Sequence, residues 1–201
     1  MKTLFTLDIK NYKPEWKRSE RHSARAIIRL DDGRIALVYA KNLGYYKFPG
    51  GGIHEDEDKI AALVREVAEE TGLVVVPESV MEYGVAHRFQ KSTRKADEIF
   101  VQDSFYYTCD VERSSDAGEG RDGLKITRQN LDDYEDEAGF ELRVVPLEEA
   151  ISANRAYSDS DAFNIVMIAR DLRVLEMLAG VPSEPSPVFL KYFSDCAILP
   201  L

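Results

Sequence analysis

Three glutamates, Glu66, Glu69 and Glu70, lie within one stretch of five residues. If this stretch is helical, the side chains of Glu66 and Glu70 lie about 40° apart around the axis, and Glu69 lies about 60° to the other side of Glu66. Carboxylates this close repel one another by roughly a few tenths of a kcal/mol per pair, unless a cation lies among them. Their hard oxygen atoms, with no Cys or His nearby, favour Mg²⁺, or Mn²⁺ in its place. The spacing therefore predicts a metal site, and a solvated helix face is the alternative.

A run of three glycines, Gly50, Gly51 and Gly52, precedes this stretch. Because they lack Cβ atoms, their backbone N–H groups can approach a ligand closely. The N-terminus of the following helix favours negative charge. A diphosphate suits both features, so we expect the three glycines and Arg88 to contact phosphate oxygens. The alternative is that the glycines only make a turn and that Arg88 is an ordinary surface charge.

The positions around these residues resemble the Nudix box, a family signature. Gly51, Glu57 and the run from Arg65 to Leu73 read G-x5-E-x7-R-E-U-x-E-E-x-G-U, where U is a bulky aliphatic residue. The resemblance covers residues 51–73 and matches every fixed position. It implies a Nudix hydrolase, in which water activated by a metal attacks one phosphorus of a diphosphate.

The resemblance also implies a role for each matching residue. Metal ligation falls to Glu66, Glu69 and Glu70, and Glu69 and Glu70 count as catalytic. Glu57 and Arg65 are expected to form an ion pair that supports the site without taking part in the chemistry.

A further carboxylate from outside the box usually completes such a site, as a metal ligand or as the base that takes a proton from water. An acidic run at residues 132–137 precedes a predicted strand that leads into Pro-Leu-Glu-Glu, a form common in related sequences. We expect Glu137 to be this catalytic carboxylate, with Glu135 and then Glu98 as alternatives. Because the run has no fixed spacing, it can also be a solubilising loop.

The composition limits the domain organisation. With 201 residues, 44% of them hydrophobic, the chain can bury the core of one domain. We divide it into an N-terminal strand and connector at 1–20, a Nudix hydrolase domain at 21–180 and an apolar tail at 181–201. The tail is expected to pack on the domain or to form a homodimer contact. The two cysteines, Cys109 and Cys196, do not make a disulfide framework.

Charge and segment composition narrow the partners. A formal net charge of -10 disfavours nucleic acid, because phosphate backbones bind basic surfaces. The first ten residues lack the features of a signal peptide, and no stretch reaches about 18 apolar residues. We expect a cytoplasmic protein without a membrane partner that acts on a small phosphorylated, nucleotide-like substrate.

Periodicity predicts the elements that position the site. Strands are expected over 4–9, 22–30, 34–40, 45–48, 80–87, 98–111 and 140–145, with a hairpin turn at Asp31-Asp32-Gly33. Helices are expected from Asp58 through the box, over 147–153 and over 161–178, and residues 112–128 are expected to form a surface excursion. The order of elements and the Nudix resemblance indicate an α/β (α+β) chain with the Nudix fold, a mixed β-sheet sandwiched between helices.

Two other functions are compatible with this fold. A non-hydrolytic Nudix domain could sense a nucleotide and regulate a partner, but a sensor need not retain all three glutamates. Isomerase chemistry on an isoprenoid diphosphate uses a cysteine and extra histidines that have no obvious counterparts here. Subclass markers outside the box are absent, so the sequence does not choose among nucleotide sugars, dinucleotides and nucleoside triphosphates.

Overall fold

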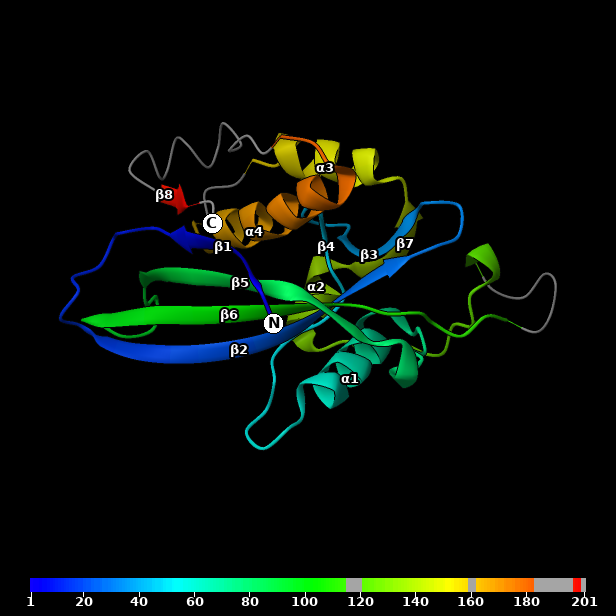
Figure 1. Ribbon diagram of the computed structural model, residues 1–201, viewed down its shortest axis with the longest axis horizontal. Helices are drawn as coiled ribbons and strands as arrows, with labels where there is room; N and C mark the ends of the chain where they lie inside the picture. Colours follow the sequence, from blue (N-terminus) through cyan, green and yellow to red (C-terminus); the bar gives the residue numbers. More distant parts are fainter. Residues whose placement is uncertain (115–120, 159–161, 183–196, 200–201) are drawn as a thin grey trace.

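The computed structural model describes residues 1–114, 121–158, 162–182 and 197–199. A twisted β-sheet runs through the middle of the molecule (Figure 1). Helix α1 (Lys59–Thr71) covers one face, and helices α3 (Leu147–Ala156) and α4 (Ala162–Ala179) cover the other. The sheet between helices confirms the predicted fold class.

Eight strands make up the described sheet. Their bounds are Thr3–Asp8 (β1), Lys17–Arg29 (β2), Ile35–Ala40 (β3), Tyr45–Lys47 (β4), Met81–Lys91 (β5), Glu98–Thr108 (β6), Phe140–Val145 (β7) and Ala197–Leu199 (β8). The order across the sheet is β4-β3-β2-β6-β5-β1-β8, and β7 pairs with β3. The β2–β6 and β1–β5 pairs are parallel and the others are antiparallel, so the sheet is mixed as predicted.

The longest strand, β2, joins the two halves of the sheet. Its first eleven residues, 17–27, pair with β6, and its last two pair with β3. The predicted turn between β2 and β3 is present, because Gly33 adopts a φ of 85° and Asp32 Oδ1 accepts a hydrogen bond from the Arg34 N–H at 3.0 Å. A glycine suits this left-handed conformation.

Apolar side chains pack on both faces of the sheet because successive side chains of a strand point to opposite faces. From β2, Ala24, Ala26 and Ile28 pack toward α1, in one cluster with Leu63 and Val67. The other face carries a larger cluster in which side chains of α3 and α4 pack on β1, β2 and β3. Because α1 is fixed on β2, the carboxylates of the box have a set position relative to the sheet.

Both ends of α1 are set by local chemistry. Asp58 is the N-cap, and its Oδ1 accepts from the N–H groups of Ile60 at 2.8 Å and Ala61 at 3.2 Å. Gly72 ends the helix in the left-handed conformation, with a φ of 72°. A Cβ atom at Gly72 would lie 2.3 Å from the Thr127 carbonyl oxygen, so no larger residue fits there. The predicted helix is therefore present, with Asp58 as its N-cap rather than its first residue and with its end at Thr71, two residues before the end of the box.

The acidic run at 132–137 is largely helical, which the sequence analysis did not predict. Helix α2 (Asp133–Ala138) begins after Asp132, whose side chain accepts from the Glu135 N–H at 2.9 Å. In return, Glu135 Oε2 accepts from the Asp132 N–H at 3.0 Å. This reciprocal pair is a capping box, and Gly139 ends the short helix with a φ of 68°. The run is therefore an ordered element next to β7.

The first and last described strands lie side by side. β1 pairs with β5 and is part of the same sheet, and β8, the described part of the tail, pairs antiparallel with β1. Residues 183–196 and 200–201 of the predicted tail lie outside the described residues. Cys109 is a buried free thiol, and Cys196 also lies outside them.

The segment at 112–128 leaves the domain and returns to it. A β-bridge joins Arg113 to Leu124, and another joins Leu73 to Ile126, while residues 115–120 lie outside the described residues. Two short 3-10 turns, Pro77–Ser79 and Arg121–Gly123, complete the described helical segments. Within the described ranges, no helix is long and apolar enough to cross a membrane.

Candidate metal centre and its supporting residues

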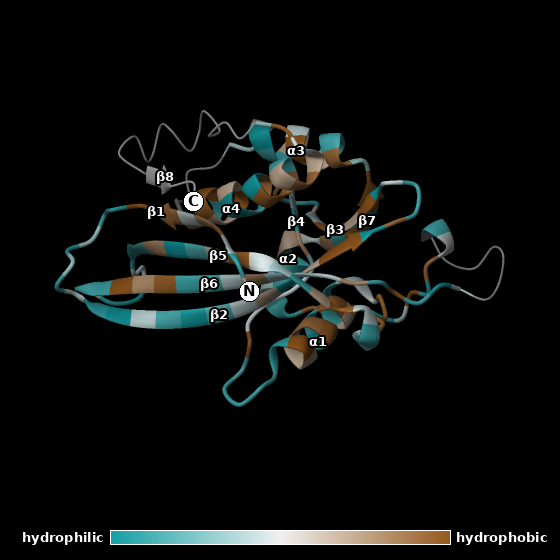
Figure 2. Cartoon of the chain, in the orientation of Figure 1, coloured by the Kyte–Doolittle hydropathy of each residue, from teal (hydrophilic) through white to brown (hydrophobic). Residues whose placement is uncertain are grey.

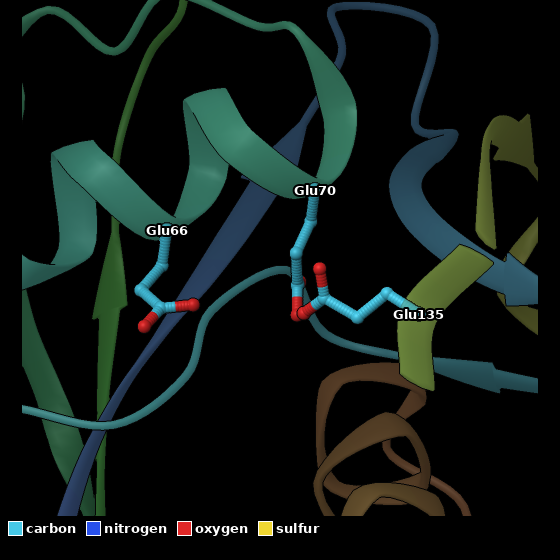
Figure 3. A group of neighbouring side chains, drawn as sticks. All are labelled: Glu66, Glu70 and Glu135. Carbon is cyan, nitrogen blue, oxygen red and sulfur yellow. The ribbon is translucent and has the colours of Figure 1, made fainter. Parts of the chain in front are cut away.

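Three carboxylates from two helices meet beside the C-terminal half of α1. Glu66 and Glu70 come from α1, and Glu135 comes from α2. One oxygen of each lies within 4.8 Å of the others. Figure 3 shows the carboxylates of Glu70 and Glu135 meeting, with Glu66 one turn back along α1. The structure therefore brings together two of the predicted ligands and the first alternative from the acidic run.

Glu70 is the most buried member of this group, with 1% of its surface exposed. Its Oε1 accepts a hydrogen bond from Lys47 Nζ, and its Oε2 accepts one from the Gly50 N–H at 2.9 Å. A buried carboxylate needs such partners, because an unpaired charge away from water costs on the order of several kcal/mol. Glu70 is thus held between β4 and the glycine loop.

The glycine loop is itself held by Arg25, a buried residue of β2. Arg25 Nη1 donates to the carbonyl oxygens of Phe48 at 3.2 Å and Gly50 at 2.5 Å. Gly50 has a φ of 133°, and a Cβ atom there would lie 2.1 Å from the Ala24 carbonyl oxygen. Only glycine fits so close to β2, and this approach sets the direction of the N–H that binds Glu70.

Glu66 lies directly against Gly51. A Cβ atom on Gly51 would come within 2.1 Å of Glu66 Oε2, so any side chain at this position would displace the carboxylate. Burial raises the pKa of Glu66, and the charge of Glu70 raises it further, against the opposing hydrogen bond from Arg65.

Arg65 joins the loop to the helix. Its Nε and Nη2 donate to the two oxygens of Glu57, each at 2.8 Å, and Nη2 also donates to the Gly52 carbonyl oxygen at 3.0 Å. Its Nη1 donates to Glu66 at 2.8 Å and to Glu69 at 3.1 Å. The hydrogen bonds from Arg65 lower the pKa of Glu57 to about 2. The expected ion pair between Glu57 and Arg65 is present.

Glu135 differs from the other two carboxylates of the cluster in its partners. Its described hydrogen bond comes from a backbone N–H, that of Asp132, at 3.0 Å. Burial raises the pKa of Glu135 to about 7, and the nearby charge of Glu70 also raises it. The capping box thus turns this side chain back from α2 toward α1.

The other predicted acids lie outside the cluster. Glu69 is 35% exposed and shares Arg65 with Glu66. Glu137 is exposed on α2. Glu98, at the start of β6, pairs with Lys95 at 3.6 Å.

Arg88, expected to contact phosphate, lies in the interior of the sheet. It is 1% exposed, and its Nε and Nη2 donate to Gln90 Oε1 at 3.0 and 2.7 Å. These bonds go to a neighbour on β5 rather than to the glycine loop, so the structure does not bring Arg88 together with Gly50, Gly51 and Gly52.

A family model, that of the NUDIX domain, matches residues 20–165, which is most of the chain. The chain belongs to the NUDIX family. A curated relative, nucleoside diphosphate-linked moiety X motif 6 of Xenopus laevis, is 31% identical over 97 residues, and this match covers 47% of the chain. It covers 45% of the relative, so this Nudix chain aligns with less than half of that protein.

Two solved structures resemble this Nudix chain in part. A NUDIX hydrolase from Nitrosomonas europaea has 16% sequence identity and a TM-score of 0.43, over 76% of this chain and 89% of its own. The solution structure of the E. coli ORF135 protein has 22% identity and a TM-score of 0.43, over 83% and 96%. Neither likeness is close enough to assign a substrate.

The donor set of this Nudix site fits a hard divalent cation. Three carboxylate oxygens converge without Cys or His, which is the ligand type that Mg²⁺ prefers. The raised pKa values of Glu66 and Glu135 show that these carboxylates are desolvated and crowded. A cation bound among them would favour their ionised forms.

Two supporting residues were not assigned these roles from the sequence. Lys47 binds Glu70, and Arg25 holds the glycine loop. For Arg25 a signal was present: it stands between Ala24 and Ala26 in an apolar strand. A lone cation on the inward side of a buried strand needs acceptors, and backbone carbonyl oxygens supply them here.

Proposed function

We propose that this Nudix chain hydrolyses a diphosphate bond in a small nucleotide-like substrate, with Mg²⁺, or Mn²⁺ in its place, held by Glu66 and Glu70 and with Glu135 beside it as the base. The observation that supports this proposal best is the convergence of these three carboxylates beside the glycine loop. Membership of the NUDIX family favours a nucleoside diphosphate linked to another group, a dinucleotide or a nucleoside triphosphate as substrate.

A divalent cation bound there would lower the pKa of its bound water and neutralise charge on the diphosphate oxygens. The three carboxylates would then divide the remaining tasks according to their partners. Glu70 is fixed by Lys47 and Glu66 by Arg65, so both suit ligation. Glu135 is the carboxylate not tied to a cation by a described hydrogen bond, and it is the best placed to take a proton from the attacking water.

The glycine loop would hold the diphosphate. The Gly50 N–H is already bound to Glu70, whereas Gly51 and Gly52 use their carbonyl oxygens to accept from the Ala24 N–H and from Arg65. The N–H groups of Gly51 and Gly52 are therefore the ones proposed to donate to phosphate oxygens.

Two acids predicted from the sequence take smaller parts in this proposal. Glu135 replaces Glu137 as the carboxylate from outside the box, because only Glu135 points into the cluster. Glu69 would enter the coordination of the metal only by leaving Arg65, which makes it the weakest ligand of the three box glutamates.

The test is a panel of nucleotide sugars, dinucleotides and nucleoside triphosphates, incubated with the protein and Mg²⁺ and analysed by mass spectrometry of the products. We expect hydrolysis of at least one compound, lost in EDTA and in Glu66→Gln, a variant that keeps the bond between Lys47 and Glu70. Glu69→Gln is the matched variant on the same helix and should lose less activity. Tight binding without turnover across the panel would favour a sensor, and turnover that survives both EDTA and Glu66→Gln would overturn the metal assignment.

A further inference from the structure

A pocket of about 560 Å³ opens where β2 and β6 begin, where β5 ends and where α4 begins. Its wall combines cations, hydrogen-bonding side chains and aromatic rings, including Arg21, Arg94, Gln90, Ser92, Phe100 and Phe163. The start of β2 is mostly hydrophilic, whereas β6 carries hydrophobic bands near its start (Figure 2). The volume is large enough for a substituent of a small molecule.

Arg21 connects this pocket to the metal centre. Its Nη2 lies 3.3 Å from the position that a Cβ atom would take on Gly52, and its charge interacts with that of Glu66. Pairing between Ser23 and Gly52 keeps the strand and the loop together. A substrate whose diphosphate lies on the glycine loop would therefore reach the pocket past Arg21.

The polar side chains named from this wall mainly offer donors. Because Gln90 Oε1 already accepts two hydrogen bonds from Arg88, the Gln90 side chain has its NH₂ group left to present. Ser92 Oγ accepts from the backbone N–H of Arg94 at 3.2 Å, which leaves its hydroxyl proton available. The guanidinium groups of Arg21 and Arg94 can only donate. A ligand that satisfies these groups must bring acceptors.

Arg88 adds a buried positive charge behind the wall. Its guanidinium lies 4.8 Å from the ring centre of Phe163 and 5.7 Å from that of Phe100, and its buried Nη1 has no hydrogen-bond partner. Arg170 is equally buried but has Asp171 at 2.9 Å, whereas Arg88 pairs with no carboxylate of the described chain. Burial lowers the pKa of Arg88 to about 9, and the charge of Arg170 adds to this, yet Arg88 is still a cation at neutral pH. An anion nearby would offset this cost.

The wall also carries two acids, Glu20 and Glu98, as many as its arginines. Glu98 pairs with Lys95 at 3.6 Å, and Glu20 is exposed, as Arg21 and Arg94 are. With Arg88 behind the wall and Lys95 beside Glu98, cations outnumber acids at this pocket, although the formal net charge of the chain is -10.

We propose that the pocket binds an anionic group, a phosphate monoester or a carboxylate, that the substrate carries in addition to its diphosphate. Arg21 and Arg94 contact this group, Gln90 and Ser92 donate to its oxygens, and Arg88 contributes its charge from behind. This assignment rests on the proposed function for the diphosphate itself. It narrows the substrate class to diphosphate compounds with a second anionic site.

Matched ligand pairs test the proposal. NAD⁺ and NADP⁺, and likewise dephospho-coenzyme A and coenzyme A, differ by one phosphate monoester, and UDP-glucose and UDP-glucuronate differ by one carboxylate. Dissociation constants are measured by calorimetry in EDTA, for the wild-type protein, for Arg94→Gln and for Arg113→Gln. Arg113 is the control, because it pairs with Asp31, beyond the opposite end of β2.

We expect the wild-type protein to bind the more charged member of at least one pair about tenfold more tightly. Arg94→Gln should bring the two affinities within about twofold, and Arg113→Gln should keep the preference. Equal affinities in every pair, or a preference that Arg94→Gln leaves intact, would overturn the proposal. Turnover with Mg²⁺ is measured separately: a preference without turnover would overturn the hydrolase alone, and turnover without a preference would overturn the pocket alone.

Discussion

The metal centre and the arginine-lined pocket are neighbours along β2, and they carry opposite charges. The centre gathers Glu66, Glu70 and Glu135, and the pocket gathers Arg21 and Arg94 in front of Arg88. In both, burial shifts a pKa toward the neutral form, upward for a carboxylate and downward for a guanidinium. The comparison indicates a ligand with the opposite order of charges, a cation among the carboxylates and an anion among the arginines.

The two regions differ in how firmly their charged groups are held. Each carboxylate of the centre has a named donor, namely Lys47 with the Gly50 N–H, Arg65, or the Asp132 N–H. The pocket has no such framework, since Arg88 binds only a neutral amide. The centre is therefore preorganised, whereas the proposed anionic group would complete the pocket.

The largest expected effect is a loss of activity when Glu135, the carboxylate that comes from α2, is changed. We expect Glu135→Gln to lower kcat/KM by at least about 100-fold, because an amide carries no negative charge and cannot take the proton from water. Glu137→Gln changes an exposed residue of the same helix and should stay within about twofold. Steady-state rates on the substrate found in the panel measure both, and equal losses would place the essential acid elsewhere.

The second prediction concerns the stability of the centre. Glu70→Gln leaves the buried ammonium of Lys47 without its anion, so the free energy of unfolding should fall by roughly 3 kcal/mol. Adding Lys47→Met to that variant should recover a large part of the loss. Urea denaturation gives the comparison, with Glu66→Gln as the variant expected to change little. A double variant no more stable than Glu70→Gln alone would show that the unpaired charge of Lys47 does not cause the loss of stability.

A third prediction compares two buried arginines. Arg170→Met leaves the buried carboxylate of Asp171 without its ion-pair partner and should destabilise the fold by roughly 3 kcal/mol. Arg88→Met leaves no carboxylate without an ion-pair partner and should change stability by less than about 1 kcal/mol in either direction. Thermal unfolding of the two variants measures both changes in stability. If Arg88→Met were as damaging as Arg170→Met, Arg88 would be a structural residue of the core.

The smallest expected effect is on the free energy of unfolding at acid pH. Because Arg65 lowers the pKa of Glu57 to about 2, from an ordinary value of 4.5, their pair contributes stability that is fully present above about pH 4.5. This contribution is lost as pH falls toward 2. Its size should be on the order of 1 kcal/mol, because the pair lies at the surface and is screened by solvent. The stabilities of the wild-type protein and of Glu57→Gln should converge as pH falls from about 4.5 toward 2, and a difference that does not change with pH would count against the pair.

The parts of the fold that the sequence predicted are those with fixed local signals. Helix α1 has an N-cap at Asp58, a glycine stop at Gly72 and the invariant spacing of the box between them. These signals act within a few residues, so they can be recognised without knowledge of the fold. The turn before β3 belongs to the same class.

The parts that were not predicted depend on contacts between distant segments. Glu137 was preferred to Glu135 for its place a few residues ahead of the predicted strand at 140–145, yet Asp132 and Glu135 have the spacing of a capping box. That signal would have found both α2 and the direction of Glu135. No local signal places Arg88 in the interior behind Phe100 and Phe163, because Phe163 comes from α4, far along the chain.

The pairing of β8 with β1 also bears on how the protein is made. Thr6 lies opposite Leu199, so the edge of β1 is covered by a segment that is synthesised much later than β1 itself. Until then, β1 presents a row of unpaired backbone groups on that side, which is a site for pairing with another chain. Contacts between such distant residues form slowly. A nascent chain that has not yet reached β8 therefore has this edge open to misassembly.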